Sequence, residues 1–427
     1  MEELKKQMSI LQVFKKTEPK EVFIPRGDFS KYKTMYVNRP ELEEALLEAL
    51  ETDMNVLVQG TSGIGKTWLT RYVLEENNYY YKIINLASAS SSNSIYDCFA
   101  KLMSREGWTI RTKYSEYKQA SVSIPCAGGE INHTDEYITP VDYYMEFLKF
   151  MKHRAHSKGK NRYIIFENFE QILTNKKLIK ELTNLIMLVD DDEVSKFNTK
   201  FIIIGATNNI LDYFSKVSNQ DTIDNRLYEL PYISTLSYAQ STNLIKRGFD
   251  KIGIEFANEN EENEYFKYIA NKTNGIPQRI HELCLILSRI CVKNDYKAEI
   301  RLLDEAVAKW IKTSFSNNYT NLQNYMTHGK GKRKNQILYC LGLKDDNSFS
   351  AKEVLNDLKS EFPYSNIKTK SITKELKEFT NTNPQLLVFN EISKQYYFSD
   401  IKNVLCIRAS LYKDSEERVE CFNFDQI

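Results

Sequence analysis

The residue types best able to do chemistry are concentrated in one run of eight residues. This run matches the pattern G-x-x-x-x-G-K-[ST] and directly follows an apolar run at 55–59. Glycines permit a tight backbone path in which successive N–H groups point at an anion, and a helix that begins there adds its positive end. The lysine is then expected on the β and γ phosphates of a nucleotide and the hydroxyl on Mg²⁺. The predicted phosphate-binding loop comprises Gly60, Thr61, Ser62, Gly63, Ile64, Gly65, Lys66 and Thr67.

A second group of polar residues follows the apolar run 163–166. By position Glu167 is the acid that holds Mg²⁺ through water, and Asn168 falls where a catalytic glutamate is expected. An amide can orient water but cannot take its proton, so hydrolysis should be slow unless Glu170 or a neighbouring subunit supplies the base. A frame shifted by one residue would make Glu167 the base and leave the metal position to Phe166. We prefer the first frame because hydrophobic Phe166 continues the strand.

Two later positions could face the γ-phosphate. Asn208, or Thr207 beside it, follows the apolar run 201–205, although an asparagine after a strand is also a common turn former. Arg226 precedes the short strand predicted at 228–230. It could reach a triphosphate bound by a neighbouring subunit or simply form a surface salt bridge.

The elements that must position these residues predict an α/β fold. Between 33 and 231, short β-branched or aromatic runs alternate with amphipathic helices, a pattern typical of a parallel sheet covered on both faces. One stretch, 109–131, alternates polar and apolar residues and is predicted to form a β-hairpin or extra strands inserted between the second and third sheet strands. It would be either a surface that faces a partner or DNA, or an ornament. The predicted strands are 55–59, 81–86, 163–166 and 201–205, and the predicted helices include 67–76, 94–106 and 141–153.

The remaining sequence predicts four further regions. Residues 1–32 form a charged lead-in, 232–315 a helical lid and 316–334 a linker. Three short helices and a β-hairpin then predict a winged-helix domain at 335–427. The predicted lid helices are 236–253, 261–273, 277–293 and 300–315; those of the last domain are 335–343, 351–361 and 370–380, with strands at 386–390 and 395–398.

These motifs occur in the order of AAA+ P-loop ATPases. Over about residues 30–315 the chain resembles the initiator (origin-recognition-type) clade and also STAND and transposition-regulator ATPases; the order starts at 36–42 (YVNRPEL) and ends at 274–280 (NGIPQRI). The resemblance implies adenine contacts near Val37 and Arg39, and a lid arginine on the γ-phosphate. Gln278 occupies that lid position, so either sensing of the nucleotide is weakened or Arg279 serves. Gln278 is thus one departure from the family pattern, and the pair Glu167 and Asn168 is a second.

Composition narrows the possible partners and location. A net charge of +1 excludes attraction of the whole molecule to nucleic acid. No apolar run is long enough to span a bilayer, the N-terminus lacks a signal-like apolar stretch, and seven cysteines show no CxxC pair. These features predict a cytoplasmic protein with reduced thiols and no membrane partner.

The predicted winged helix leaves the partner open. Its third helix offers Lys374 and Lys377 beside Glu375 and Glu378, and 330–334 (KGKRK) is basic, so either duplex DNA or a protein could bind there. We therefore expect a switch that uses ATP or ADP with Mg²⁺ and assembles with DNA or protein, and that forms a homo-oligomer if Arg226 acts on a neighbour. The alternatives are a STAND-like signalling ATPase of prokaryotic antiphage defence that acts through a protein effector, and a scaffold that hardly hydrolyses ATP.

Overall fold

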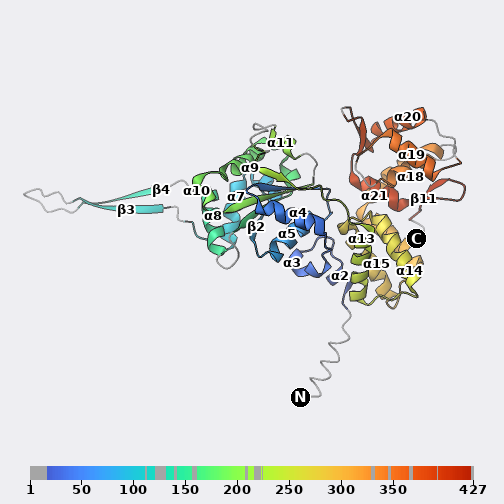
Figure 1. The fold of residues 1–427 in the computed structure, drawn as a ribbon, viewed down its shortest axis with the longest axis horizontal. Helices are drawn as coiled ribbons and strands as arrows, with labels where there is room; N and C mark the ends of the chain where they lie inside the picture. The colour runs from blue at the N-terminus through green and yellow to red at the C-terminus, as the bar shows by residue number, and fades with distance from the viewer. Residues whose placement is uncertain are drawn as a thin grey trace, which may run out of the picture. The chain divides into compact units, whose positions relative to one another are not determined.

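The computed structural model describes most of the chain and divides into two compact units (Figure 1). The core unit is Asn38–Ser234, and the helical unit joins Met1–Val37 to Thr235–Ile427. None of the helices in the described part of the chain is both long and apolar enough to span a membrane. The described residues are 17–110, 113–120, 131–138, 142–155, 161–206, 210–215, 223, 225–327, 332–344, 348–364, 369–391 and 393–424.

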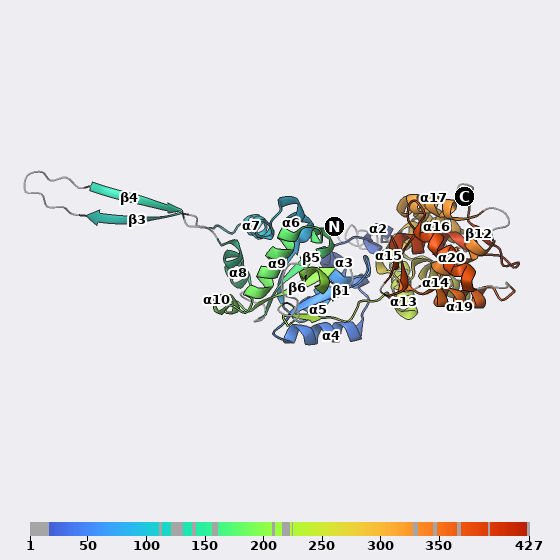
Figure 2. The ribbon, with the colours of Figure 1, turned by 90° about the horizontal axis from the view of Figure 1, so that it is seen from above.

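The core unit is built on a five-stranded parallel sheet with the order β2-β5-β6-β1-β7. Helices cover both faces, with α4 (Pro40–Glu51) and α5 (Lys66–Glu76) on one side and α7 (Ile95–Arg105) and α9 (Lys176–Leu188) on the other (Figure 2). The predicted α/β fold is thus confirmed. Because the strands are parallel, the residues that follow them meet at one carboxyl edge. The strands are β1 (Asn55–Gln59), β2 (Tyr80–Asn85), β5 (Arg162–Glu167), β6 (Thr199–Gly205) and β7 (Leu227–Glu229).

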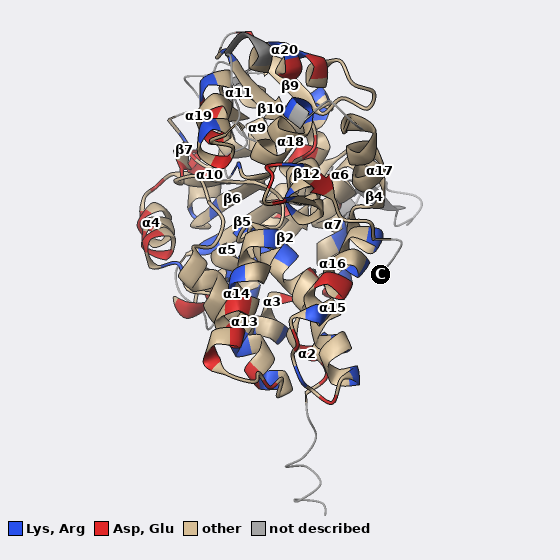
Figure 3. Ribbon diagram, turned by 90° about the vertical axis from the view of Figure 1, so that its right-hand side faces the viewer, with Lys and Arg blue, Asp and Glu red and all other residues tan. Residues whose placement is uncertain are grey.

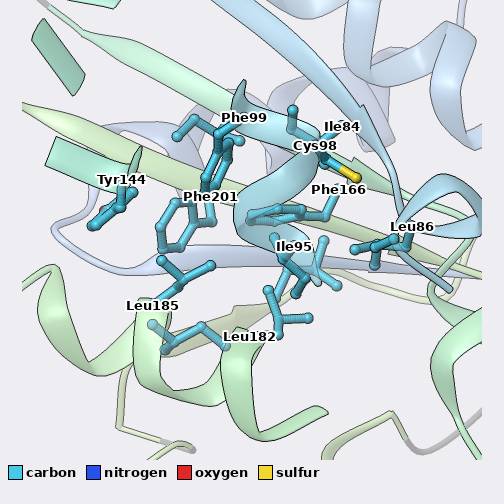
Figure 4. Packing of buried hydrophobic residues seen from close by; sticks show 14 of the residues in the cluster. Ile84, Leu86, Ile95, Cys98, Phe99, Tyr144, Phe166, Leu182, Leu185 and Phe201 are labelled. Atoms are coloured by element: carbon cyan, nitrogen blue, oxygen red, sulfur yellow. The ribbon is translucent and has the colours of Figure 1, made fainter. Parts of the chain in front are cut away.

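An aromatic cluster fills the space between the sheet and α7, α8 (Tyr143–Arg154) and α9. Phe166 and Phe201 lie on the adjacent strands β5 and β6, and their ring centroids are 5.3 Å apart. The ring centroid of Phe99 in α7 is 6.3 Å from that of Phe166 (Figure 4). All three side chains are fully buried. Burial of a large aromatic side chain stabilises by roughly 2–3 kcal/mol, so this face fixes the helices on the sheet.

The predicted hairpin is present but longer than expected. Strands β3 (Lys113–Ala120) and β4 (Ile131–Ile138) pair antiparallel, from Lys113 opposite Ile138 to Ala120 opposite Ile131, in a sheet of their own. The predicted end at 131 was wrong. The sequence of β4, INHTDEYI, is too polar to indicate a strand by itself, and β4 forms by pairing with β3. Residues 111–112 and 121–130 lie outside the described part.

The predicted lead-in is partly structured. Helices α2 (Pro19–Val22) and α3 (Phe29–Tyr32) and the 3₁₀ turn η1 (Lys33–Met35) belong to the helical unit. Phe23 is fully buried against Gly248, where an added Cβ would come within 2.2 Å of its ring. The Ile24 N–H donates to His281 Nδ1 at 3.1 Å. Burial lowers the pKa of His281 to about 4, with the positive charge of Arg247 acting in the same direction.

The predicted lid helices are confirmed to within a few residues, as α13 (Tyr238–Ile252), α14 (Glu259–Thr273), α15 (Pro277–Lys293) and α16 (Arg301–Ser314). The predicted linker at 316–334 is instead helical at its start. Helix α17 (Ser316–Tyr325) buries Leu322 and Tyr325, and the Tyr319 hydroxyl donates to the Phe422 carbonyl at 2.7 Å. The many asparagines of this segment suggested a loop, although Tyr319, Leu322 and Tyr325 recur every third residue, as on one face of a helix.

The C-terminal region, residues 335–424 of the described chain, follows the predicted order. Strands β8 (Ser348–Phe349), β9 (Leu387–Asn390) and β10 (Gln395–Phe398) form an antiparallel sheet in the order β8-β10-β9. The three predicted helices of this region are α18 (Lys332–Gly342), α19 (Ala351–Glu361) and α20 (Thr369–Thr380). Strand β8, helix α21 (Ile401–Ser410) and the pair β11 (Leu411–Lys413) and β12 (Val419–Cys421) were not predicted.

Candidate functional site

The eight-residue loop connects β1 to α5, as the sequence predicted. Gly63 and Gly65 have φ values of 84° and 88°, a left-handed conformation that favours glycine. A Cβ at Gly60 would lie 2.3 Å from the Ile64 side chain and 2.9 Å from the Ile233 carbonyl. The glycines are therefore required by the backbone path and by close packing, and the loop leads directly into the N-terminus of α5.

Lys66 lies inside this loop. Its Nζ atom donates to the carbonyls of Gly60 and Thr61, both at 2.8 Å, and the side chain is buried. Burial lowers the pKa of Lys66 to about 8, and the negative charge of Glu170 opposes that shift. An anion bound in the loop would add a second opposite charge and raise the pKa of Lys66 again.

Glu167 ends β5, opposite Asn85 of β2. The hydroxyl of Thr67, the second residue of α5, acts on this carboxyl group and lowers its pKa. Its Oε1 atom is fully buried and has no hydrogen-bond partner among the described residues. Burial raises the pKa of Glu167, whereas the Thr67 hydroxyl and the charge of Arg71 lower it.

These two side chains fit a magnesium ion. A buried charged acceptor without a partner costs about 1–3 kcal/mol or more, and a divalent cation would remove that cost. Carboxylate and hydroxyl oxygens are the donors that Mg²⁺ prefers. Phe166, the metal ligand position in the shifted frame, is fully buried in the aromatic cluster on the opposite face of the strand (Figure 4). The geometry therefore favours the frame in which Glu167 faces the metal.

Asn168 has a backbone role that the sequence did not indicate. Its φ of 60° lies in the left-handed region, where asparagine is favoured among non-glycine residues. Its Nδ2 donates to Asn85 Oδ1 at 2.9 Å, and the same oxygen accepts from the Ala87 N–H at 2.9 Å to cap α6 (Leu86–Ser92). The amide is thus oriented by a partner on the neighbouring strand.

Gln59, which the sequence did not single out, and Glu170, which was considered only as a base, bond to the residues on either side of segment 207–209. Glu170 Oε2 accepts from the Ala206 N–H at 3.0 Å, and Gln59 Oε1 accepts from the Ile210 N–H at 3.1 Å. Gln59 also donates to the Glu229 carboxylate. Thr207 and Asn208 lie outside the described residues, so their role stays a prediction. A buried glutamine at the end of an apolar strand was the available signal for Gln59.

Arg226 lies at the amino edge of the sheet, away from the loop of its own chain. Its carbonyl accepts from the Asn55 N–H at 2.9 Å, and four residues of β1 lie between Asn55 and Gly60 of the loop, so that about 16 Å of extended chain separates the two. Its side chain pairs with Asp190 at 2.6 Å, the salt bridge anticipated as the alternative. Contact with the nucleotide of a neighbouring subunit stays a prediction.

Arg39 is buried and bonded to the loop itself. Its Nη2 donates to the Ile64 carbonyl at 2.8 Å and its Nη1 to the Ser234 carbonyl at 3.2 Å. Val37 belongs to the helical unit and is half-buried. The adenine contact expected of both residues is untested, and the guanidinium of Arg39 already has other partners.

Arg279 belongs to a hydrogen-bonded cluster in the helical unit. Its Nη1 lies 2.8 Å from both carboxylate oxygens of Glu282. Glu282 also accepts from Gln278 and from the Trp310 ring nitrogen, each at 3.0 Å. Both residues considered for the lid position are thus held by one carboxylate, which the sequence analysis had missed.

No family model and no curated protein matches the chain. Similar solved structures include the Walker-type ATPase PABY2304 of Pyrococcus abyssi, with a TM-score of 0.48, 14% identity, and coverage of 88% of this chain and 96% of that one. The Aeropyrum pernix ORC2 protein in its ADPNP–ADP complexes gives 0.47 and 11%, with 92% and 95% covered. The Thermotoga maritima RuvB Holliday junction branch migration motor gives 0.41 and 10%, with 88% and 96% covered. Because each TM-score is below 0.5, the roles proposed below rest on the geometry of this chain.

Proposed function

We propose that the chain is an AAA+ P-loop ATPase that binds ATP and ADP with Mg²⁺ and works as a slow switch. The observation that carries the proposal is the Glu167 carboxylate, whose buried Oε1 atom has no partner among the described residues and whose pKa the Thr67 hydroxyl lowers. A metal–triphosphate complex supplies the cation that this pair lacks. Loop N–H groups and the Lys66 ammonium bind the phosphates beside it.

Hydrolysis is proposed to be slow because the residue after Glu167 is an amide. Asn168 orients water, and Glu170 is the carboxylate that could accept its proton, since its charge acts on the Lys66 ammonium. Asn208 is proposed to contact the γ-phosphate, and its segment is held at both flanks. Arg226 is proposed to act on the nucleotide of a second copy in a homo-oligomer, and Arg279 to sense the nucleotide once released from Glu282.

The C-terminal region is proposed to be a winged-helix domain, which its order of three helices and an antiparallel sheet supports. A protein partner is favoured over duplex DNA. Residues 335–427 contain 12 Lys and Arg against 14 Asp and Glu, and α19 and α20 each carry both signs (Figure 3). Lys334 of the basic run lies over the Phe379 ring at 5.3 Å, so that run is partly engaged in packing.

This balance of charge favours the STAND-like alternative, in which the chain is a signalling ATPase of the cytoplasm whose partner is a protein effector. Antiphage defence is the setting proposed for such a switch. Light scattering after size-exclusion chromatography with ADP, an ATP analogue and duplex DNA would measure assembly; DNA binding that weakens steeply with salt would contradict the preference for protein.

The proposed nucleotide binding is tested by titrating ATP with Mg²⁺ or with EDTA. Lys66→Ala and Thr67→Ala should each weaken ATP binding at least tenfold, the second only when Mg²⁺ is present. Lys200→Ala is the matched control, because Lys200 also donates to two backbone carbonyls and also has its pKa lowered by burial, but lies at the amino edge of the sheet. The proposal is wrong if the wild type shows no ATP or ADP affinity, or if Lys66→Ala binds as the parent does.

A further inference from the structure

We propose that Arg39 is a positioning residue of the phosphate-binding loop. Its guanidinium fixes the peptide between Ile64 and Gly65, so that the Gly65 N–H faces the bound phosphates. This inference rests on the nucleotide binding proposed above. It departs from the adenine contact that the sequence resemblance implies for Arg39.

The guanidinium is held in one place by several bonds. It joins two carbonyls that are far apart in sequence, those of Ile64 and Ser234, and only 7% of the residue is exposed. The backbone of Arg39 is fixed as well, since its N–H donates to Glu43 Oε1 at 2.6 Å and its carbonyl accepts from the Glu43 N–H at 2.9 Å. This places Arg39 rigidly at the start of α4.

A planar trans peptide transmits this constraint to the loop. The C=O and N–H of one peptide point in opposite directions, so a carbonyl of Ile64 bonded to Arg39 turns the Gly65 N–H to the other side. Gly63 and Gly65, with φ values of 84° and 88°, flank Ile64 and leave that peptide easy to rotate. A bond from outside the loop therefore selects one orientation before a ligand arrives, which lowers the entropy lost on binding.

The second carbonyl extends the effect of Arg39 beyond the loop. Residues 230–234 run along β1, with the Leu230 N–H on the Leu57 carbonyl and the Ile233 N–H on the Gln59 carbonyl, both at 3.0 Å. Ser234 is the last residue of the core unit, and the helical unit continues from Thr235. One buried cation thus holds both the loop and the segment that leads out of the core.

The test separates a loop-positioning role from a base contact by using ligands with and without a base. Affinities of ATP, GTP and inorganic tripolyphosphate, each with Mg²⁺, are measured by competition against a fluorescent ATP analogue. Arg39→Gln should weaken all three by one common factor, roughly ten- to hundredfold, the value of a charge-assisted hydrogen bond. The affinities of Arg39→Lys should lie between those of Arg39→Gln and those of the wild type, because an ammonium can reach only one of the two carbonyls.

Arg162→Gln is the matched control. Arg162 donates to the Phe197 carbonyl at 2.6 Å and has its pKa lowered by burial, but it lies at the amino edge of the sheet, so all three affinities should be unchanged. A loss confined to ATP, with tripolyphosphate unaffected, would identify a base contact and overturn the proposal, as would unchanged affinities. Thermal unfolding without ligand shows whether Arg39→Gln folds. If it does not, the test uses Arg39→Lys, which should weaken the binding of all three ligands by one common factor. A wild type that binds none of the three ligands refutes the proposed function itself, before any variant is compared.

Discussion

Asn168 donates from Nδ2 to the Oδ1 atom of Asn85 at 2.9 Å, at the carboxyl edge of the sheet where the phosphate-binding loop begins. This bond engages the amide nitrogen and directs the carbonyl oxygen of the Asn168 side chain elsewhere. That oxygen can accept a hydrogen bond from water, but an amide has no basic atom at neutral pH. The pair therefore explains how the site could hold a nucleophilic water without activating it.

A carboxylate at this position should accelerate hydrolysis. We expect Asn168→Glu to raise the turnover number for ATP roughly a hundredfold, because a general base contributes about 10²–10⁴-fold. The dissociation constant for ATP should change less than threefold, since Asn168 does not lie in the loop. Phosphate release under saturating ATP measures the first quantity, and competition with a fluorescent analogue measures the second.

Asn198→Glu is the control for the backbone. Asn198 also has a positive φ, 46°, and donates from Nδ2 to Asn161 Oδ1 at 2.9 Å, but it precedes β6 at the amino edge. Both substitutions should lower stability by about 1 kcal/mol, the cost of a non-favoured residue in the left-handed region. Only Asn168→Glu should gain turnover; an equal gain in Asn198→Glu, or none in either, would refute the assignment of Asn168 to the water position.

Glu167 should destabilise the ligand-free protein. Burial raises its folded pKa above the unfolded value, so its contribution is stabilising below the unfolded pKa and is lost as pH rises through the folded pKa. At pH 7 without nucleotide, Glu167→Gln should therefore raise the melting temperature, and this gain should shrink as the pH is lowered toward 4.5. The same variant should lose the stabilisation that Mg²⁺–ATP gives the wild type. A lower melting temperature at pH 7 would show that the carboxylate is already compensated within the protein.

The elements around the phosphate-binding loop were predictable because their signals are local. Strands β1, β5 and β6 each contain an uninterrupted apolar run, and the glycine spacing from Gly60 to Gly65 has few other structural uses. Two of the four lid helices, α13 and α14, begin with side-chain caps, such as the Ser237–Gln240 capping box of α13. Neighbouring residues alone specify these features.

What the sequence could not predict depends on contacts between distant residues. Phe23 is buried against position 248, where a Cβ would meet its ring, and in α17 the Tyr319 hydroxyl bonds to the distant Phe422 carbonyl. The bond from Arg39 to the Ile64 carbonyl belongs to the same class, since no local pattern indicates which carbonyl a buried arginine will reach. Such residues look like ordinary charged or aromatic positions until the fold is known.

His281 should make the helical unit sensitive to acid. Its folded pKa, about 4, lies below the unfolded value near 6.5, so the unfolded state binds the proton more readily. The stability linked to neutral His281 is complete above pH 6.5 and is lost as pH falls toward 4, by up to about 3 kcal/mol. Hydrogen exchange of Ile24, whose N–H it accepts, should accelerate over that range. His281→Gln should remove this pH dependence and exposed His153→Gln should not; identical profiles in both would contradict the prediction.

Arg408 should join α21 to the end of α18 and to the turn before α15. Its guanidinium donates to the carbonyls of Gly342, at 2.6 Å, and Lys344, at 3.0 Å, and also to the Asn274 side chain in the turn before α15. Arg408→Ala removes all three donors, and at about 1 kcal/mol for each hydrogen bond the local stability should fall by about 3 kcal/mol. Hydrogen exchange of α18 should therefore accelerate about a hundredfold, while ATP affinity should remain within twofold of the wild type.

Arg418→Ala is the control for this last prediction, because Arg418 is half exposed and pairs only locally, with Glu416. An exposed pair of this kind contributes little, so α18 should exchange as in the wild type. Faster exchange of α18 in both variants would mean that the region is loosened by any loss of charge. Unchanged exchange in Arg408→Ala would mean that packing of α21, rather than the guanidinium, holds the C-terminal region in place.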